Sequence, residues 1–413
     1  MTAQAVWWIL LLVLTAGFVW EQYLDLLNAK RFDAPLPPEV DDVFDAEEYR
    51  RSMDYKKTYY RFGLWKSLMW FVLVAAALLT GFFGRLDAWL TRYVQDDFWR
   101  AMAYFAVLYV LQWVISLPWE VYATFRIEEK FGFNRRTPGL FAADQIKSFL
   151  LGLVLGGLIL GAVVWFYERT GPYFWLWAWG VISGFSLLIS MFFTDLILPL
   201  FNKLTPLPPG ELRDKLEALA TETGFRLRDI YVIDGSKRSS KANAFFSGIG
   251  PRKRIVLYDT LVDEMTSDEI TAVLGHEIGH YRHGHVRKQL LLSVLTTGVM
   301  LFLFSLVVDR PEVAGALGAA APSFQIGLTA FALLYGPVSE LTAWFTNSLS
   351  RHFEFQADAF AARYGYAGSL TSALKKLAGK HLSNLTPHPL YVRFRYSHPP
   401  LAERIKHLKK QEK

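Results

Sequence analysis

A five-residue run, His-Glu-Ile-Gly-His at residues 276–280, has the residue types and the spacing to bind a catalytic metal ion. On a helix, His276 and His280 lie on one face, one turn apart, so their imidazoles could share a zinc ion. Glu277 points to an adjacent face, where its carboxylate could hold a water bound to the same metal. The pattern is typical of zinc proteases, with Glu277 as the general base. Two unrelated histidines on a surface helix are the alternative interpretation.

A third ligand decides which kind of zinc site this could be. The longer motif with a histidine six positions beyond His280 fails, because Val286 stands there. Downstream, Glu354 and Asp358 are four residues apart and would share a helix face. Glu354 could complete a two-His, one-Glu zinc site with its fourth position left to water. Asp358 could then accept a hydrogen bond from the outer nitrogen of a zinc-bound histidine. A solvated acidic helix face is the alternative.

The remaining histidines offer one further candidate for catalysis. His398 precedes two prolines, and proline restricts the residue before it to extended geometry. We therefore expect His398 on a turn, where it could donate a hydrogen bond to an oxyanion; a packing or capping role is the alternative. His283 and His285 follow the metal motif closely, and either could support a ligand from outside the metal site.

A candidate substrate-binding edge precedes the metal motif. Residues 229–233 and 254–258 have the composition of short β-strands, and residues 243–250 lie between them. The glycines of this segment suit an exposed edge strand. An edge strand beside a zinc helix could pair with an extended peptide, whereas a plain hairpin is the alternative.

The elements that must position these residues include membrane helices. The chain has 413 residues, of which 52% are hydrophobic and 20% charged, and it has no cysteine, which excludes disulfides and thiolate metal sites. Its net charge of +6 is simplest to explain by anionic lipid, and we expect no nucleic-acid partner.

A bilayer crossing needs about 20 mostly apolar residues. Stretches of this kind cover residues 1–20, 67–84, 101–119, 148–167, 170–194, 289–308 and 323–349.

The short loops predict the orientation of these seven spans. With an outside N-terminus, the two inside loops hold more than twice as many Lys and Arg residues as the outside loops, as cytoplasmic loops do. The C-terminus and the zinc site then lie on the cytoplasmic side. We expect four parts: residues 1–200 with five spans, 201–288 as a peptidase domain, 289–349 as a transmembrane hairpin, and 350–413 with the third ligand and a C-terminal catalytic segment. The hairpin brings both ligand sets to one membrane face.

Four sequence runs, together with the seven spans, resemble one family. They are HEIGH at 276–280, EFQAD at 354–358, KANAFFSGIG from 241 and YSHP from 396. The chain resembles the integral-membrane zinc metalloproteases of the type I CAAX prenyl protease family over nearly its whole length. The resemblance implies that one zinc ion is bound by His276, His280 and Glu354. It implies that Glu277 is the general base, that His398 positions substrate or stabilises the transition state, and that Asn243 contacts substrate.

The resemblance also implies a fold and a reaction. The expected fold is mainly α: seven transmembrane helices around an internal water-filled chamber, with a small α+β zinc-peptidase domain and with Asp195 and Glu340 facing the chamber. The expected reaction is endopeptidase cleavage near the C-terminus of CAAX-type, prenylated peptides. A broader quality-control protease for membrane proteins is the first alternative, and a non-catalytic transporter or scaffold is the second. The composition suits a bacterial inner membrane, while the oligomeric state stays open.

Overall fold

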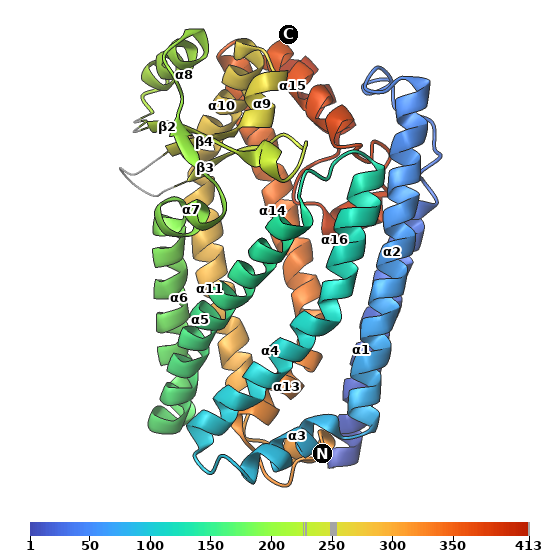
Figure 1. The fold of residues 1–413 in the computed structure, drawn as a ribbon, viewed down its shortest axis with the longest axis vertical. Coiled ribbons are helices and arrows are strands. Elements are labelled where there is room, and N and C mark those ends of the chain that lie inside the picture. Colours follow the sequence, from blue (N-terminus) through green and yellow to red (C-terminus); the bar gives the residue numbers. More distant parts are fainter. Residues whose placement is uncertain (226, 228, 248–253, 412–413) are drawn as a thin grey trace.

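The structure, a computed structural model, describes residues 1–225, 227, 229–247 and 254–411. Long helices form a tall bundle, and a small sheet with shorter helices covers one end of it (Figure 1). The α-helices are α1 (Ala3–Ala29), α2 (Ala46–Leu79), α3 (Phe82–Thr91), α4 (Asp97–Tyr122), α5 (Pro138–Thr170), α6 (Phe174–Phe192), α7 (Leu198–Phe201), α8 (Glu211–Glu222), α9 (Asp259–Glu264), α10 (Ser267–Arg282), α11 (His285–Ser305), α12 (Pro311–Ala316), α13 (Phe324–Leu334), α14 (Gly336–Arg363), α15 (Ala367–Lys380), α16 (Pro389–Arg395) and α17 (Leu401–Gln411). The π-helical turns η1 (Ala123–Glu128) and η3 (Phe193–Ile197) continue α4 and α6, and the 3-10 turns are η2 (Gly171–Tyr173) and η4 (Gly235–Lys237).

The bundle consists of helices suited to a bilayer. Among the described residues, five helical stretches are long and apolar enough to cross a membrane: Ala3–Ala29, Ala46–Leu79, Asp97–Glu128, Pro138–Phe201 and His285–Ser305. The bent pair α13 and α14 makes a sixth when it is counted as one span. Large apolar side chains such as Leu158 and Trp177 are more than half exposed on the bundle, as contact with lipid requires. The protein is therefore built as an integral membrane protein.

Two predicted spans differ in detail from the helices. The stretch 67–84 is not one helix, because α2 ends at Leu79 and Gly81 adopts the left-handed conformation (φ 63°) before α3 begins. The stretch 323–349 is bent by 55° between α13 and α14. Pro337 lies in the first turn of α14, and proline cannot donate the backbone hydrogen bond that a continuous helix needs.

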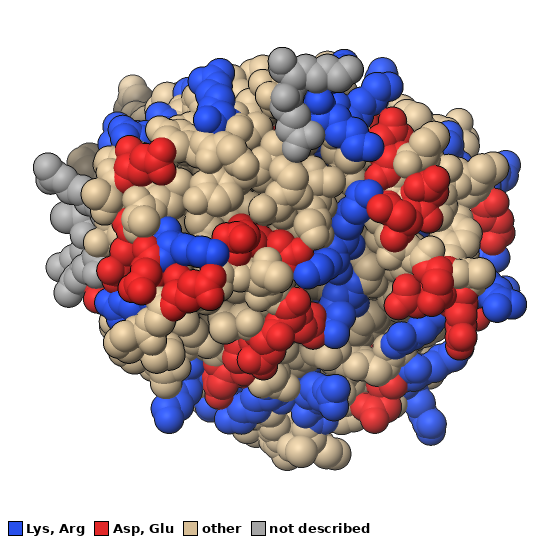
Figure 2. Space-filling model, turned by 90° about the horizontal axis from the view of Figure 1, so that it is seen from above, with Lys and Arg blue, Asp and Glu red and all other residues tan. Residues whose placement is uncertain are grey.

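The charged end of the bundle carries a four-stranded sheet. The strands are β1 (Leu204–Pro206), β2 (Asp229–Ile233), β3 (Ala244–Ser247) and β4 (Arg254–Tyr258), in the order β1-β2-β4-β3. β2 and β4 are parallel, the other pairs are antiparallel, and β3 forms an edge as predicted. Residues 248–250 of the predicted edge segment lie outside the described residues. Lys, Arg, Asp and Glu are interspersed over this end (Figure 2), which is typical of a surface in water.

The metal-motif helix α10 is fixed between the sheet and α14. A capping box of Thr266 and Glu269 begins it. Ile278 is fully buried in a core shared with the sheet, so the histidines face the other way. A Cβ on Gly279 would lie 2.9 Å from the Cα of Ala357 on α14. The glycine of the motif therefore lets the two helices pack at close range.

Candidate metal centre

Three predicted ligands converge between α10 and α14. The Nε2 atoms of His276 and His280 are 3.1 Å apart. The carboxylate of Glu354 lies 3.4 Å from His276 Nε2 through Oε2 and 3.2 Å from His280 Nε2 through Oε1. All three ligand atoms lie within 4.8 Å of one another, and they form a possible metal-binding group.

The chemistry of this group fits a divalent metal ion. Glu354 is buried, and within the described part of the chain its Oε2 has no hydrogen-bond partner, although the Arg404 guanidinium is 3.4 Å away. A buried carboxylate oxygen without a hydrogen bond is costly unless something else satisfies it. Two imidazoles and one carboxylate are a known catalytic zinc set, and bonds of about 2.0–2.2 Å in tetrahedral geometry separate the ligand atoms by about 3.3 Å. The observed separations match that spacing.

The outer nitrogen of His276 is held as the sequence predicted. Its Nδ1 lies 2.8 Å from Oδ1 of Asp358, whose side chain is fully buried. If Nδ1 carries the proton, the lone pair of Nε2 faces the other ligands. Burial alone would lower the pKa of His276, but the hydrogen bonds to Asp358 and Glu354 outweigh it and raise this pKa to about 9. A proton and a metal ion therefore compete for this imidazole.

A chain of hydrogen bonds, here called the relay, holds His280 through His285 and Gln356. Its Nδ1 lies 3.0 Å from Nδ1 of His285, and His285 Nε2 lies 2.8 Å from Oε1 of Gln356. The Gln356 amide nitrogen faces His352 Nε2 at 3.2 Å, which favours this orientation of the amide. When Gln356 accepts from His285, Nδ1 of His285 is left to accept from His280. The lone pair of His280 Nε2 then also points toward the possible metal-binding group, so His285 is the neighbouring histidine that supports a candidate ligand.

The other predicted site residues line one cavity beside these ligands. The cavity has a volume of about 610 Å³, and its wall includes Asn243, Glu277, Glu354 and His398. His398 lies on a turn before Pro399, with its side chain 63% exposed and its Nε2 3.3 Å from Glu354 Oε1. Asn243 is exposed at the start of β3, and its Oδ1 accepts a hydrogen bond from the next backbone amide at 2.9 Å. One open space thus adjoins two of the possible metal ligands, His276 and Glu354, as well as Asn243, Glu277 and His398.

Comparisons with known proteins agree with this arrangement. The model of the CAAX prenyl protease N-terminal domain with five membrane helices matches residues 25–203, and the model of peptidase family M48 matches residues 206–412. The chain belongs to peptidase family M48. It is a metalloendopeptidase with a membrane-embedded helical bundle.

Relatives of this M48 peptidase extend over almost its whole length. A CAAX prenyl protease 1 homolog from Oryza sativa is 36% identical over 94% of this chain and 93% of that protein. CAAX prenyl protease 1 from Saccharomyces cerevisiae is 34% identical over 94% of this chain and 92% of its own. The crystal structure of Ste24p from S. mikatae superimposes with a TM-score of 0.92 at 32% identity, covering 98% of this chain and 99% of that one.

Arg404 is a buried residue of the M48 peptidase that sequence reasoning did not select. Its guanidinium donates to both carboxylate oxygens of Asp358, at 2.6 and 2.9 Å. Arg404 lies on α17 with the buried Ile405 and Leu408. The spacing of these apolar residues in the sequence places Arg404 on the buried face, and a buried arginine needs a carboxylate partner. That signal marks Arg404 as a residue that needs an acidic partner, although it does not say which one.

Two further residues fix the turn that carries His398. On α14, Asn347 Nδ2 donates to Phe394 O at 2.8 Å, and Arg351 Nη1 donates to Tyr396 O at 2.6 Å. Arg351 also donates to Val392 O at 2.9 Å. The spacing of 347, 351, 354 and 358 puts these anchors on the same helix face as the third ligand and Asp358. One face of α14 thus holds both the ligand and the His398 turn.

The two carboxylates expected in the chamber have basic partners in the M48 peptidase. Glu340 Oε2 accepts from Arg395 at 2.9 Å and from the Trp20 indole at 3.3 Å, and Arg395 itself lines the 610 Å³ cavity. Asp195 forms an ion pair with Arg254. Neither charge is left alone beside the apolar helices.

Proposed function

We propose that this M48 peptidase is a zinc endopeptidase that cleaves prenylated CAAX-type peptides near their C-terminus. The observation that carries the proposal is the convergence of two imidazoles and one carboxylate beside Glu277 in a cavity of about 610 Å³. The names of the full-length relatives, CAAX prenyl protease 1 and its homologs, support the substrate class.

One zinc ion is the proposed cofactor, held by His276, His280 and Glu354. Bound zinc would lower the pKa of a coordinated water to about 7 and polarise a carbonyl. Asp358 and His285 keep the two ligand imidazoles in the tautomer whose Nε2 lone pair is free. Arg404 balances the charge of Asp358 in the buried layer behind the ligands.

The catalytic steps fall to groups on the cavity wall. Glu277 accepts the proton of the attacking water and passes it to the leaving nitrogen. His398, whose Nδ1 is 2.9 Å from Ser397 Oγ, donates from Nε2 to the oxyanion. The substrate backbone pairs with the free edge of β3, and Asn243 contacts it where that edge enters the cavity.

The proposed membrane arrangement has seven spans enclosing a water-filled chamber, with a small α+β peptidase domain at its cytoplasmic end. The 64-residue stretch Pro138–Phe201 comprises α5 and α6, which run side by side in Figure 1 and would be two spans. With α1, α2, α4, α11 and the bent pair α13–α14, the total is seven. The loop charges support an outside N-terminus. The relatives compared above are eukaryotic, so a bacterial inner membrane is an expectation from composition alone.

Cleavage of a fluorogenic farnesylated CAAX peptide by the purified protein in detergent tests the function. An unprenylated twin peptide and the Glu277→Gln variant are the controls. We expect cleavage that is faster with the lipid and that falls about 10²- to 10⁴-fold in the variant while zinc stays bound.

Other outcomes would redirect the assignment. Equal cleavage of both peptides would indicate the broader membrane protease instead. Normal cleavage by Glu277→Gln would show that the assigned base is wrong. Absence of zinc by metal analysis, with no cleavage of either peptide, would favour the transporter or scaffold.

A further inference from the structure

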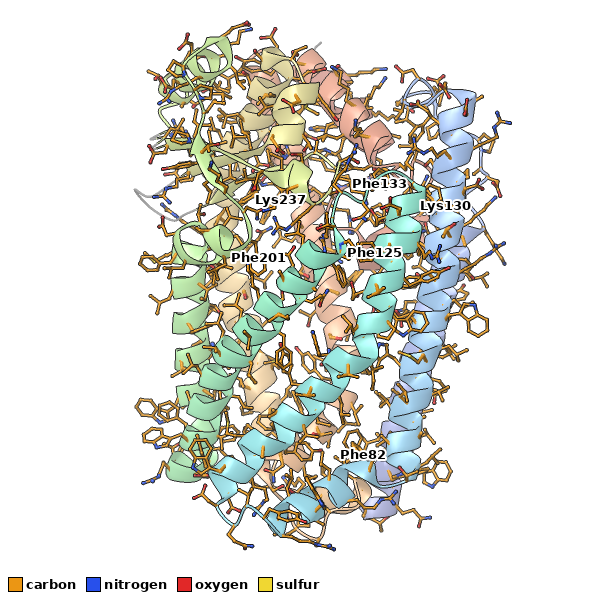
Figure 3. The ribbon with its side chains drawn as sticks, in the orientation of Figure 1. Phe82, Phe125, Lys130, Phe133, Phe201 and Lys237 are labelled. Carbon is orange, nitrogen blue, oxygen red and sulfur yellow. The ribbon has the colours of Figure 1, made fainter. Side chains whose placement is uncertain are left out.

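The segment that leads into the β3 edge is fastened to the membrane helices. Arg135 N donates to Arg238 O, and Ser240 N donates to Phe133 O, each at 3.2 Å. Ser240 Oγ also donates to Gly132 O at 3.1 Å. Residues 238–241 therefore run along the loop that follows η1, directly before Asn243 and β3. Figure 3 shows Phe125, Lys130 and Phe133 together where the chain leaves η1.

Three ion pairs join the same part of the sheet region to three membrane helices. Asp144 on α5 binds Arg238 with two hydrogen bonds of 2.8 Å. Glu128, at the end of η1, pairs with Lys241, and Asp195, in η3, pairs with Arg254. In each pair the carboxylate belongs to a membrane helix and the cation belongs to a residue that flanks β3 or begins β4. Both π-helical turns carry one of these carboxylates, and such turns often occur at functional sites.

Lys241 is the anchor nearest to the substrate edge. Its Nζ donates to Glu128 Oε2 and to Tyr55 OH, both at 2.9 Å, and it lies 4.3 Å from the centre of the Phe133 ring. The hydroxyls of Tyr55 and Tyr59 in turn donate to Glu128 Oε1 at 2.7 and 2.5 Å. The ammonium is thus held by a carboxylate that α2 itself keeps in place.

The backbone of the same residues continues into the cavity wall. Lys241 O accepts a hydrogen bond from Thr260 Oγ1 at 3.1 Å, and Asn243 O accepts one from Tyr258 N at 3.0 Å. Asn243 is two residues beyond Lys241, so a shift of the lysine moves the start of the edge. A misplacement of about 1 Å can cost 10²-fold in rate when a reacting group must meet a fixed partner.

We propose that Lys241, through Glu128, Tyr55 and Tyr59, is a positioning residue that sets the register of a substrate strand on β3 relative to the metal ligands. The inference rests on the proposed function. Loss of the anchor leaves the amides of the edge intact, so peptides still pair, but the scissile carbonyl no longer meets one fixed position. The wrong peptide bond is then also cleaved, because strand pairing without a fixed register slips.

The test compares Lys241→Met and Lys241→Arg with wild type on the farnesylated peptide. Turnover is measured per bound zinc, and mass spectrometry identifies the cleaved bond. Lys57→Met is the matched control, because Lys57 lies on the same helix as Tyr55 and forms an exposed ion pair with Asp33. We expect Lys241→Met to lose about 10- to 100-fold in turnover per zinc and to yield products cut at more than one bond. Lys241→Arg should regain most of the rate and a single product.

Unchanged turnover per zinc with a single cleaved bond in Lys241→Met would overturn the proposal. If that variant loses zinc or fails to fold, Tyr55→Phe decides, because it removes only the hydroxyl and keeps the ring. A folded Tyr55→Phe protein with wild-type rate and one product likewise overturns it, whereas mixed products support it. If wild type cleaves no CAAX peptide, the proposed substrate is wrong. The same variants are then compared on any unprenylated peptide that wild type does cleave.

Discussion

The candidate metal ligands and the proposed substrate-facing wall of the same cavity are held in opposite ways. Behind the ligands, side chain contacts side chain: Asp358, His285 and Arg404 are 0%, 1% and 8% exposed. Across the cavity, Asn243 and His398 are exposed, and the chain that carries them is held through its backbone by Arg351 and Tyr258. A metal site needs ligands with one fixed tautomer and direction, whereas a substrate surface must stay open and can be held only from behind.

A substitution in the buried layer behind the candidate ligands should have the largest effect on stability. In Arg404→Met, Asp358 loses the Arg404 guanidinium and stays buried, with His276 as its remaining side-chain partner among the described residues. Removing one member of a buried ion pair costs about 3–5 kcal/mol. We expect a large fall in thermal stability in detergent and loss of zinc. Arg393→Met, which changes an exposed arginine on α16, is the control and should keep the wild-type midpoint of thermal unfolding. A wild-type midpoint in Arg404→Met would mean that the buried layer does not support the ligands.

A milder change at the buried side separates metal affinity from folding. In His285→Ala, His280 loses the partner of its Nδ1. Removing such an outer partner of a ligand typically costs 10- to 100-fold in metal affinity. Competition with a chelator measures this directly. His283→Ala is the control, because His283 stacks on His285 with ring centres 5.4 Å apart, whereas the hydrogen bonds of the relay join His280, His285 and Gln356. Equal zinc affinity in both variants would argue against the relay.

A substitution that loosens the exposed wall should instead lower the turnover and leave the zinc content unchanged. Arg351→Ala removes hydrogen bonds to three backbone carbonyls around the His398 turn. Because the turn can then move, we expect turnover of the farnesylated peptide to fall about tenfold, consistent with loss of positioning. Zinc content and chelator resistance should match wild type, with Arg393→Ala as control. Loss of zinc in Arg351→Ala would erase the distinction between the two sides.

The same contrast explains what the sequence could predict. His276, His280, Glu354 and Asp358 repeat at helical spacing on two helices, so their faces could be read from the chain, and the structure brings them together. Arg404 comes from a third helix, and nothing local pairs it with Asp358. The 55° bend before α14 was missed because residues 323–349, with Glu340 as their single charged residue, have the composition of one apolar span, although Pro337 stands at the bend.

Long-range partners account for the rest of what was missed. The anchors of Lys241 lie 113 and 186 residues away, at Glu128 and Tyr55. No local spacing connects such residues, because only the packing of α2 and α4 against the sheet region brings them close. The edge position of β3, by contrast, was readable from its own composition.

A substitution at the start of α10 should have the smallest effect on the free energy of unfolding, and this effect should depend on pH. Burial alone would raise the pKa of Glu269, but hydrogen bonds from Lys376, Ser372 and the Thr266 amide outweigh it and hold this pKa below its usual value of 4.5. The lowered pKa contributes stability that is fully present above the unfolded value and is lost as the pH falls through the folded one. Glu269→Gln should therefore cost about 1 kcal/mol, as loss of a helix cap does, at neutral pH. The gap to wild type should narrow below pH 4.5, in unfolding curves recorded across that range. A constant gap at all pH values would show that the carboxylate charge does not stabilise the metal-motif helix.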